Sequence, residues 1–255
     1  VEKRLAKLGG KPAFKGYRGY PASVCVSVNE EVVHGIPGQR KLAAGDLVAV
    51  DVGVEYKGFF SDTAFSSGTG ETGAAASTLM TVTRAALWEG ISRARAGNHV
   101  SDISNAVQKF VEAAGYSVVL DFVGHGIGRH LHEDPQIPNY GAAGHGMVLQ
   151  AGQMLAIEPM VNEGGAAVRG QRRQIDGIVQ ANEEARIVGV ASGIVGVQAE
   201  ATQTRLGKRE GRRDAAEANH AALRVAKNNP AAPRATRPSV MLMPMPVSGG
   251  GGAGG

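Results

Sequence analysis

The chain has 255 residues, of which 43% are hydrophobic and 20% are charged, so it is long enough to bury a substantial core. It contains no run of about 18 apolar residues, and we therefore predict no membrane-spanning helix. The net charge of +4 is unevenly divided, because residues 1–165 carry −2 and residues 166–255 carry +6. The positive charge alone is therefore no reason to class the protein as a nucleic-acid binder.

The single cysteine, Cys25, excludes an intrachain disulfide and is typical of a protein from the reducing cytoplasm. The first residues, Val1–Arg4, are not followed by the apolar segment of a secretory signal. Because the sequence begins with Val rather than Met, we interpret the chain as a fragment or a processed product.

The regular elements are predicted in chain order from the spacing of apolar residues. Two strands, Leu47–Val54 and Phe59–Phe65, are separated by a short turn. Apolar residues recur at helical spacing over Leu79–Ile91, and a second helix is predicted over Ser101–Gly115, with Ser101 as its N-cap. A further strand is predicted over Met154–Glu158. This alternation predicts an α/β or α+β fold.

The aromatic residues divide the chain into two parts. All twelve Phe, Tyr and Trp residues lie at or before Tyr140. We therefore expect a catalytic domain over residues 1–165 and an atypical, basic, Gly/Ala/Pro-rich segment over residues 166–255, largely disordered from about residue 205. The segment Ile187–Val197 is apolar enough for strands, but three glycines interrupt it.

Two aspartates interrupt the predicted strand pair. Asp51 lies between apolar residues in the first strand, and Asp62 lies in the second. With a Tyr56-Lys57 loop the two side chains face each other directly, with a Lys57-Gly58 loop they are diagonal neighbours on one face, and a three-residue loop places them on opposite faces. Two carboxylates on one half-buried face favour a bound cation, although either could instead cap a turn or pair with an arginine.

Histidines gather in the segment Gly124–Pro135, which contains His125, His130 and His132 between glycines. Glu158 then closes an apolar strand, as Asp51 does. A mixed set of Asp, Glu and His ligands suits Mn, Fe, Co or Zn better than a thiolate-type structural site.

Six blocks of the sequence resemble, in the same order, those of type I methionine aminopeptidases. The blocks are Gly16–Cys25, Ser27–Pro37, Val50–Val52, Ser61–Thr63, Gly124–Pro135 and Ile157–Asn162. The resemblance covers about residues 8–165 and implies the pita-bread fold, in which two α/β halves surround an internal pseudo-twofold axis. In this chain we expect its C-terminal strands to be missing or replaced.

The resemblance implies removal of the initiator methionine from nascent proteins by metal-assisted hydrolysis in the cytoplasm, by a monomer. The metal ligands that it implies, for two divalent ions (Co, Mn, Fe or Zn), are Asp51, Asp62, His125 and Glu158. Glu158 is also the expected general base. The residues expected to contact the substrate are His34, His132, Tyr17, Tyr20 and Cys25, of which the two histidines also help to move protons.

One family feature has no clear counterpart. The family carries a further metal-bridging glutamate in a Gln-aromatic-Glu-His-Thr setting, and the nearest string here is Gln198–Thr202. Because this string lacks the aromatic residue and the histidine, we expect a chance match, with Glu200 as the alternative ligand. The abrupt change of composition after Gly165 suggests a shifted reading frame or an unspliced extension.

Other functions stay open. A related peptidase that cuts beside proline, or a binding protein that kept the fold and lost its chemistry, would share many of these residues. The basic run Arg205–Arg213 could contact ribosomal RNA, but it has no interleaved aromatic residue, so a solvated disordered run is the favoured interpretation and no specific nucleic-acid partner is expected.

Overall fold

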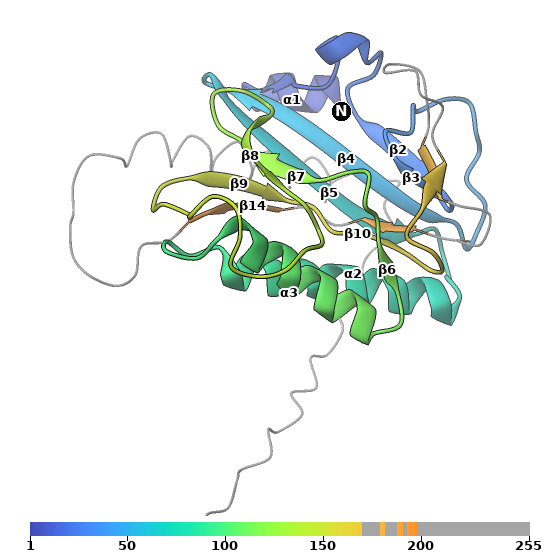
Figure 1. Cartoon of the computed structure of the whole chain (residues 1–255). Helices are drawn as coiled ribbons and strands as arrows, with labels where there is room; N and C mark the ends of the chain where they lie inside the picture. The colour runs from blue at the N-terminus through green and yellow to red at the C-terminus, as the bar shows by residue number, and fades with distance from the viewer. Residues whose placement is uncertain (170–178, 182–187, 191–192, 198–255) are drawn as a thin grey trace, which may run out of the picture.

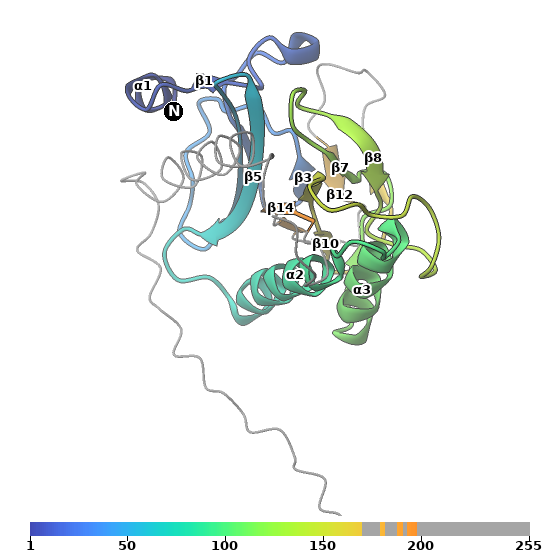
Figure 2. The same cartoon turned by 90° about the vertical axis from the view of Figure 1, so that its left-hand side faces the viewer.

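The computed structural model describes residues 1–169, 179–181, 188–190 and 193–197. Two long helices, α2 (Ala74–Arg93) and α3 (Val100–Ala113), lie side by side along one side of the strands (Figures 1 and 2). The predicted mixture of helices and strands is confirmed. Within the described ranges, no helix is long and apolar enough to cross a membrane.

Short elements precede and follow the two helices. Before them come α1 (Glu2–Lys7), β1 (Lys11–Pro12), the 3-10 turn η1 (Tyr17–Gly19), β2 (Cys25–Val28), β3 (Glu31–Val33), β4 (Leu47–Tyr56) and β5 (Phe59–Gly68). After them come β6 (Ser117–Val118), β7 (Gly124–Gly126), β8 (Glu133–Ile137), β9 (Met154–Ile157), β10 (Met160–Asn162), β11 (Val168–Arg169), β12 (Val179–Ala181), β13 (Val188–Val190) and β14 (Gly193–Gly196). Their sheets have the orders β1-β4-β2 with β5 also on β4, β14-β9-β7-β8, β13-β10-β6 and β11-β12-β3.

The β4–β5 hairpin settles the register of the two aspartates. Tyr56 pairs with Phe59, so the loop is Lys57-Gly58, and both loop residues have positive φ (51° and 74°), as a tight two-residue hairpin loop requires. Asp51 pairs with Ala64, and Gly53 pairs with Asp62. The two aspartates are therefore diagonal neighbours on one face, which is one of the arrangements that the sequence left open.

The N-terminus of α3 differs from the prediction. The helix begins at Val100, and its N-cap is His99 rather than Ser101. The backbone amide of His99 donates to Asp102 Oδ2 at 2.7 Å, while the Ser101 hydroxyl accepts a hydrogen bond from the amide of His145 at 2.7 Å. The predicted N-cap was wrong because Ser101 is occupied by a contact with a distant loop.

The core lies between the helices and the strands. One buried cluster joins Leu79, Ala86, Val107 and Val111 of α2 and α3 with residues of β4, β6 and β10. A Cβ atom on Gly90 of α2 would lie 2.9 Å from Val107 Cγ2. Glycine at this position therefore allows the two helices to approach closely.

Strands from beyond residue 165 complete two sheets. β13 pairs with β10, and β14 pairs with β9 from Gly193 opposite Ile157 to Gly196 opposite Met154. Val190 and Val197 are buried, and the amide of Val190 donates to Ser66 Oγ at 2.9 Å. The edges of β9 and β10 are thus paired by short strands, despite the glycines in this segment.

We expect a chain that ends after Gly165 to lose cooperative folding, and one that ends after Val197 to keep it. The shorter chain lacks β13 and β14 and the side chains of Val190 and Val197, which are 6% and 1% exposed. Their loss leaves apolar surface and two strand edges open. Urea unfolding followed by circular dichroism compares the two chains, and identical cooperative transitions would contradict a structural role for these strands.

Candidate metal centre

Three side chains from distant parts of the sequence converge at one point. Asp62 on β5, His125 on β7 and Glu158 directly after β9 each present one ligand atom, and these atoms all lie within 4.8 Å of one another. His125 Nε2 is 3.2 Å from Glu158 Oε1 and 3.9 Å from Asp62 Oδ2. The combination of two carboxylates and an imidazole suits a divalent transition-metal ion.

Asp51 adds a third carboxyl group to this cluster. Its side chain shares a hydrogen bond with that of Asp62. Asp51 Oδ1 is buried and has no hydrogen-bond partner in the described part of the chain, and the buried Glu158 Oε1 faces only the imidazole of His125, at 3.2 Å from Nε2. Buried oxygens without donors are costly unless a cation compensates them. The residues present therefore fit the divalent ions that the family pattern implies.

Burial and the nearby negative charges raise the pKa values of the two aspartates. Burial, and then the negative charge of Glu158, raises the pKa of Asp62 to about 6. Burial, and then the charge of Asp62, raises the pKa of Asp51 well above its usual value. A bound cation reverses this effect, because it stabilises the ionised forms of both acids.

His125 is oriented with one ring nitrogen toward the carboxylates. Its Nδ1 lies 2.8 Å from the carbonyl oxygen of Gly126, so a proton on Nδ1 leaves Nε2 free as a ligand atom. Burial lowers the pKa of His125, but its hydrogen bond and charge interaction with Glu158 outweigh burial and raise the pKa overall.

The glycines on either side of His125 are sterically required. A Cβ atom on Gly124 would lie 2.3 Å from the carbonyl oxygen of Ala156, and one on Gly126 would lie 2.2 Å from that of Asp134. Their lack of a side chain allows a close approach of the backbone at this point. This close approach brings β7 against β9 and β8 and so places His125 beside Glu158.

His132 lies at the edge of the cluster. Its ring is 4.2 Å from the ring of His125 and stacks on that of Tyr17 at 5.3 Å, and its Nδ1 is 2.9 Å from the Tyr17 hydroxyl. Desolvation of the ring lowers the pKa of His132 to about 4, and the charges of His125 and Arg18 add to this effect. His132 is therefore neutral near pH 7 and can donate one hydrogen bond.

His34, which directly follows β3 in the N-terminal part of the chain, lies near the same cluster of acids. It has a positive φ of 62°, which is unusual for a residue other than glycine, and its ring packs edge-on against Phe122 at 5.6 Å. The charge of Glu158 acts on His34, and His34 in turn acts on His132. The strained backbone and the Phe122 contact fix the ring near the acids.

Tyr20 and Cys25 lie on the β2 side of the cluster. Cys25 pairs with Asp51 across β2 and β4 and is 5% exposed. Burial, and then the charge of Asp51, raises the pKa of the Cys25 thiol, so it stays protonated. The Tyr20 hydroxyl donates to the carbonyl oxygen of Gly35 at 2.9 Å. Both side chains are therefore neutral at this position.

Asn139 is a residue that the sequence patterns did not identify. It is 1% exposed, and its Nδ2 donates to the carbonyl oxygen of Glu158 at 2.8 Å. The bond joins residues 19 positions apart and fixes the backbone at the end of β9. Its only signal in the sequence is an asparagine directly after Pro138 in the loop that follows β8, which is typical of many loops.

Some predicted residues lie outside the described ranges. They include the alternative ligand Glu200 and the basic run Arg205–Arg213. The structure brings together the four proposed ligands that lie within the described ranges, which are Asp51, Asp62, His125 and Glu158.

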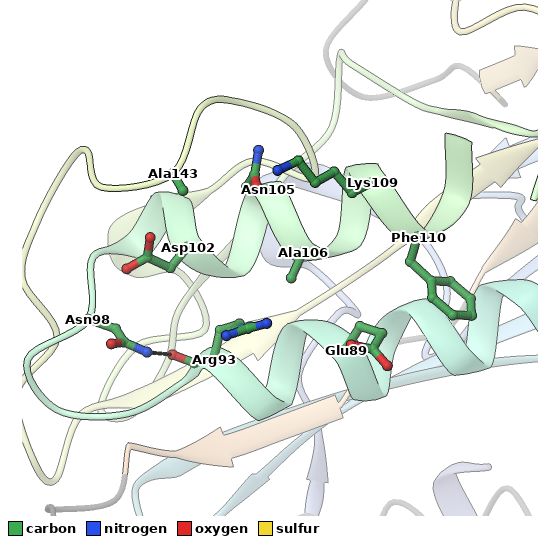
Figure 3. Close-up of a pocket in the computed structure, with 9 residues that line it drawn as sticks. All are labelled: Glu89, Arg93, Asn98, Asp102, Asn105, Ala106, Lys109, Phe110 and Ala143. Carbon is green, nitrogen blue, oxygen red and sulfur yellow. Dashed lines mark hydrogen bonds between the residues drawn. The ribbon is translucent and has the colours of Figure 1, made fainter. Parts of the chain in front are cut away.

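A separate hollow of about 620 Å³ lies between α2 and α3 (Figure 3). It shares no residue with the metal cluster, and its amides and one acid stabilise loops. Asn98 Nδ2 donates to the carbonyl of Arg93 at 2.9 Å, Asn105 Nδ2 to that of Gly141 at 2.8 Å, and Asp102 Oδ1 accepts from the amide of Gly144 at 2.9 Å. The polar side chains of this hollow are therefore engaged in holding the loops at the helix ends.

Comparison with known proteins agrees with this geometry. Residues 1–202 match the model of metallopeptidase family M24, and the chain belongs to this family. It is 50% identical over 169 residues to a methionine aminopeptidase of Clostridium perfringens, which covers 66% of this chain and 68% of the relative. It is 46% identical over 169 residues, with the same coverage, to methionine aminopeptidase 1 of Bacillus subtilis.

Solved structures show the same likeness. The methionine aminopeptidase of Rickettsia prowazekii superimposes with a TM-score of 0.74 at 34% identity, covering 77% of this chain and 79% of that one. The enzyme of Thermotoga maritima gives a TM-score of 0.72 at 44% identity, covering 76% and 77%. The predicted resemblance to methionine aminopeptidases and the pita-bread fold are confirmed.

We expect Asn139→Ala to weaken binding of Mn²⁺ about tenfold, because an outer partner of a ligand typically contributes this much to metal affinity. Asn162→Ala is the matched control, since Asn162 is fully buried and its Nδ2 donates at 3.0 Å to the carbonyl of Gly165, away from the ligands. Calorimetric titration measures both affinities. Equal losses in the two variants would contradict a role for Asn139 at the metal centre.

We also expect Asp62 to make the metal-free protein less stable as the pH rises from about 4 to about 6. The pKa of Asp62 is about 6 in the folded state and about 3.9 in an unfolded chain, so the folded state binds more protons in this window. Urea unfolding in a chelator measures stability against pH for the native protein and for Asp62→Asn. The comparison removes the opposite contribution of His132, whose pKa is lowered to about 4, and the same slope in both proteins would contradict the role of Asp62.

Proposed function

We propose that this protein removes the N-terminal methionine of nascent proteins by metal-assisted hydrolysis of the first peptide bond. The observation that carries the proposal is the convergence of Asp62, His125 and Glu158, with Asp51 and His132 beside them, in a member of family M24. The sequence and structural relatives named methionine aminopeptidase support methionine as the residue removed.

Two divalent ions, of Co, Mn, Fe or Zn, would be held by Asp51, Asp62, His125 and Glu158. When bound, such ions lower the pKa of a water molecule toward neutrality and polarise the peptide carbonyl. The carboxylates and the imidazole supply the hard and borderline ligand atoms that these ions prefer. Glu200 remains a candidate for a further ligand.

Three side chains would move protons around the scissile bond. Glu158 would accept a proton from the attacking water, since its carboxylate lies among the proposed metal ligands, 3.2 Å from His125 Nε2. His132 is neutral near pH 7 because its pKa is about 4. When the Tyr17 hydroxyl donates to Nδ1, the proton of His132 is on Nε2 and can stabilise the developing oxyanion or the peptide amide. His34 would assist from the opposite side.

The methionine side chain would pack against Tyr17, Tyr20 and Cys25. Their neutral aromatic and thiol groups suit a thioether, which makes favourable contacts with aromatic rings. The protein would act on free chain ends as a monomer in the cytoplasm, with its catalytic domain over residues 1–165. Proximity to the ribosome is a further part of this proposal.

The first test is hydrolysis of a Met-Gly peptide amide by the purified chain with added Mn²⁺ or Co²⁺. We expect release of free methionine, no cleavage of an Xaa-Pro peptide, and loss of turnover in Asp62→Asn. Release from the Xaa-Pro peptide alone would identify a different peptidase. A folded, metal-loaded protein that releases no methionine would contradict the proposal and favour a binding protein that kept the fold.

A second test isolates the proton donor. We expect His132→Ala to lower kcat by about 10²-fold, the typical effect of removing one oxyanion donor, with metal affinity unchanged. His130→Ala is the control, because His130 is an exposed histidine two residues away in the same loop. A comparable loss of kcat in the His130 variant would show that the loop, rather than the His132 ring, is responsible.

A further inference from the structure

Arg18 is held in an unusual backbone conformation beside the metal centre. Its φ and ψ are 48° and 30°, a left-handed region that is costly for a residue with a Cβ atom. Gly16 and Gly19 on either side also have positive φ. Backbone hydrogen bonds from Gly16 to the carbonyl of Tyr20 (2.8 Å) and from Gly19 to that of Gly16 (3.2 Å) close the turn. The turn therefore fixes the direction in which the Arg18 side chain leaves the backbone.

A short series of side chains links Arg18 to the cluster. The guanidinium carbon lies 5.4 Å from the centre of the Tyr17 ring, and the Tyr17 hydroxyl is 2.9 Å from His132 Nδ1. The His132 ring is in turn 4.2 Å from that of His125. The low pKa of His132 is caused mainly by desolvation and the charge of His125, and the charge of Arg18 contributes as well. The guanidinium group of Arg18 is therefore near the His132 ring.

The positive charge of Arg18 is not neutralised within the described residues. Arg18 is exposed, and no carboxylate in the described ranges lies within ion-pair distance of it, whereas Arg40 pairs with Glu31 at 3.4 Å and Lys15 with Glu2 at 2.7 Å. A guanidinium group presents a planar fork of donors that matches a carboxylate. An exposed and unpaired cation on a rigid turn beside the proposed reaction centre is suited to an external anion.

We propose that Arg18 determines specificity by binding a carboxylate of the substrate peptide downstream of the first peptide bond. The proposal rests on the proposed function, in which the free amine and the scissile bond lie at the metal ligands and His132. The following residues of the peptide then lie further out, where Arg18 is exposed. The carboxylate is either an acidic side chain at the third residue or the free C-terminus of a short peptide.

The test compares kcat/KM for amidated tetrapeptides that differ at the third residue. Met-Gly-Glu-Gly amide and Met-Gly-Gln-Gly amide are nearly equal in size and differ in charge. We expect the Glu peptide to be favoured about three- to fivefold, as an exposed ion pair allows, and the preference to shrink in 1 M salt. A parallel pair, Met-Gly-Gly with a free or an amidated C-terminus, shows whether a terminal carboxylate is bound equally well.

Arg18→Gly is the informative variant, because glycine adopts the left-handed conformation of the turn without strain. We expect its Glu-to-Gln ratio to fall to about 1. Arg129→Gln is the matched control, since Arg129 is also exposed, stacks on an aromatic ring (Phe59, 3.9 Å) and belongs to the loop that carries His132. This control should keep the ratio within about twofold of the native one.

Two outcomes overturn the proposal about Arg18. In both, the native protein still releases methionine, so the proposed function stays intact. One is equal cleavage of the Glu and Gln peptides by the native protein, and the other is a preference that survives in Arg18→Gly. If no peptide is cleaved, the proposed function fails separately. In that case, fluorescence polarisation measures the Kd of the same peptides, labelled at the C-terminal amide. Equal Kd values for the Glu and Gln peptides would overturn the role of Arg18.

Discussion

The convergence of three carboxyl groups at one point, where Asp62 is buried and Asp51 and Glu158 are partly buried, is the constraint on which the rest of the structure depends. Asp51, Asp62 and Glu158 repel one another in surroundings that also desolvate them, and this raises the pKa of both aspartates. An apolar side chain at any of these positions would be more stable in the metal-free fold. The cluster is therefore explained by the cations that it can hold, and the strands around it keep the ligand atoms close despite their repulsion.

Close backbone packing supplies that restraint. β7 can lie against β9 and β8 only because Gly124 and Gly126 have no Cβ atom. Asn139, in the loop after β8, donates a hydrogen bond to the carbonyl of Glu158 and so restrains the end of β9. These contacts involve backbone atoms, which move little once the sheet has formed. The geometry of the site is thus a property of the sheet rather than of flexible side chains.

Local patterns in the sequence predicted much of the fold and the residues of the cluster. The apolar strands around Asp51 and Asp62 and the glycines around His125 were readable because each signal lies within a few residues. The loop length of the hairpin stayed open, since the choice between adjacent turns depends on backbone dihedrals that several residues can adopt. Positive φ at Lys57 and Gly58 decided it.

Contacts between distant residues could not be predicted in the same way. His99 replaces Ser101 as the N-cap of α3 because the Ser101 hydroxyl is bonded to His145, 44 residues away. Asn139 bonds Glu158 across a loop, and an asparagine in a loop carries no signal that distinguishes it from a turn residue. These interactions depend on which segments meet in space, and one sequence does not contain that information in a local pattern.

The strands beyond residue 165 show how the site depends on the far part of the chain. β9, which ends directly before Glu158, lies between β7 and β14. Gly193 pairs with Ile157, the residue next to this ligand. An unpaired β9 would have free amides and carbonyls on one side and would fluctuate more at its end. Because Glu158 combines a ligand atom with the proposed role of general base, a small shift at this end would affect both functions. Pairing by β14 therefore contributes to the site although the strand supplies no ligand.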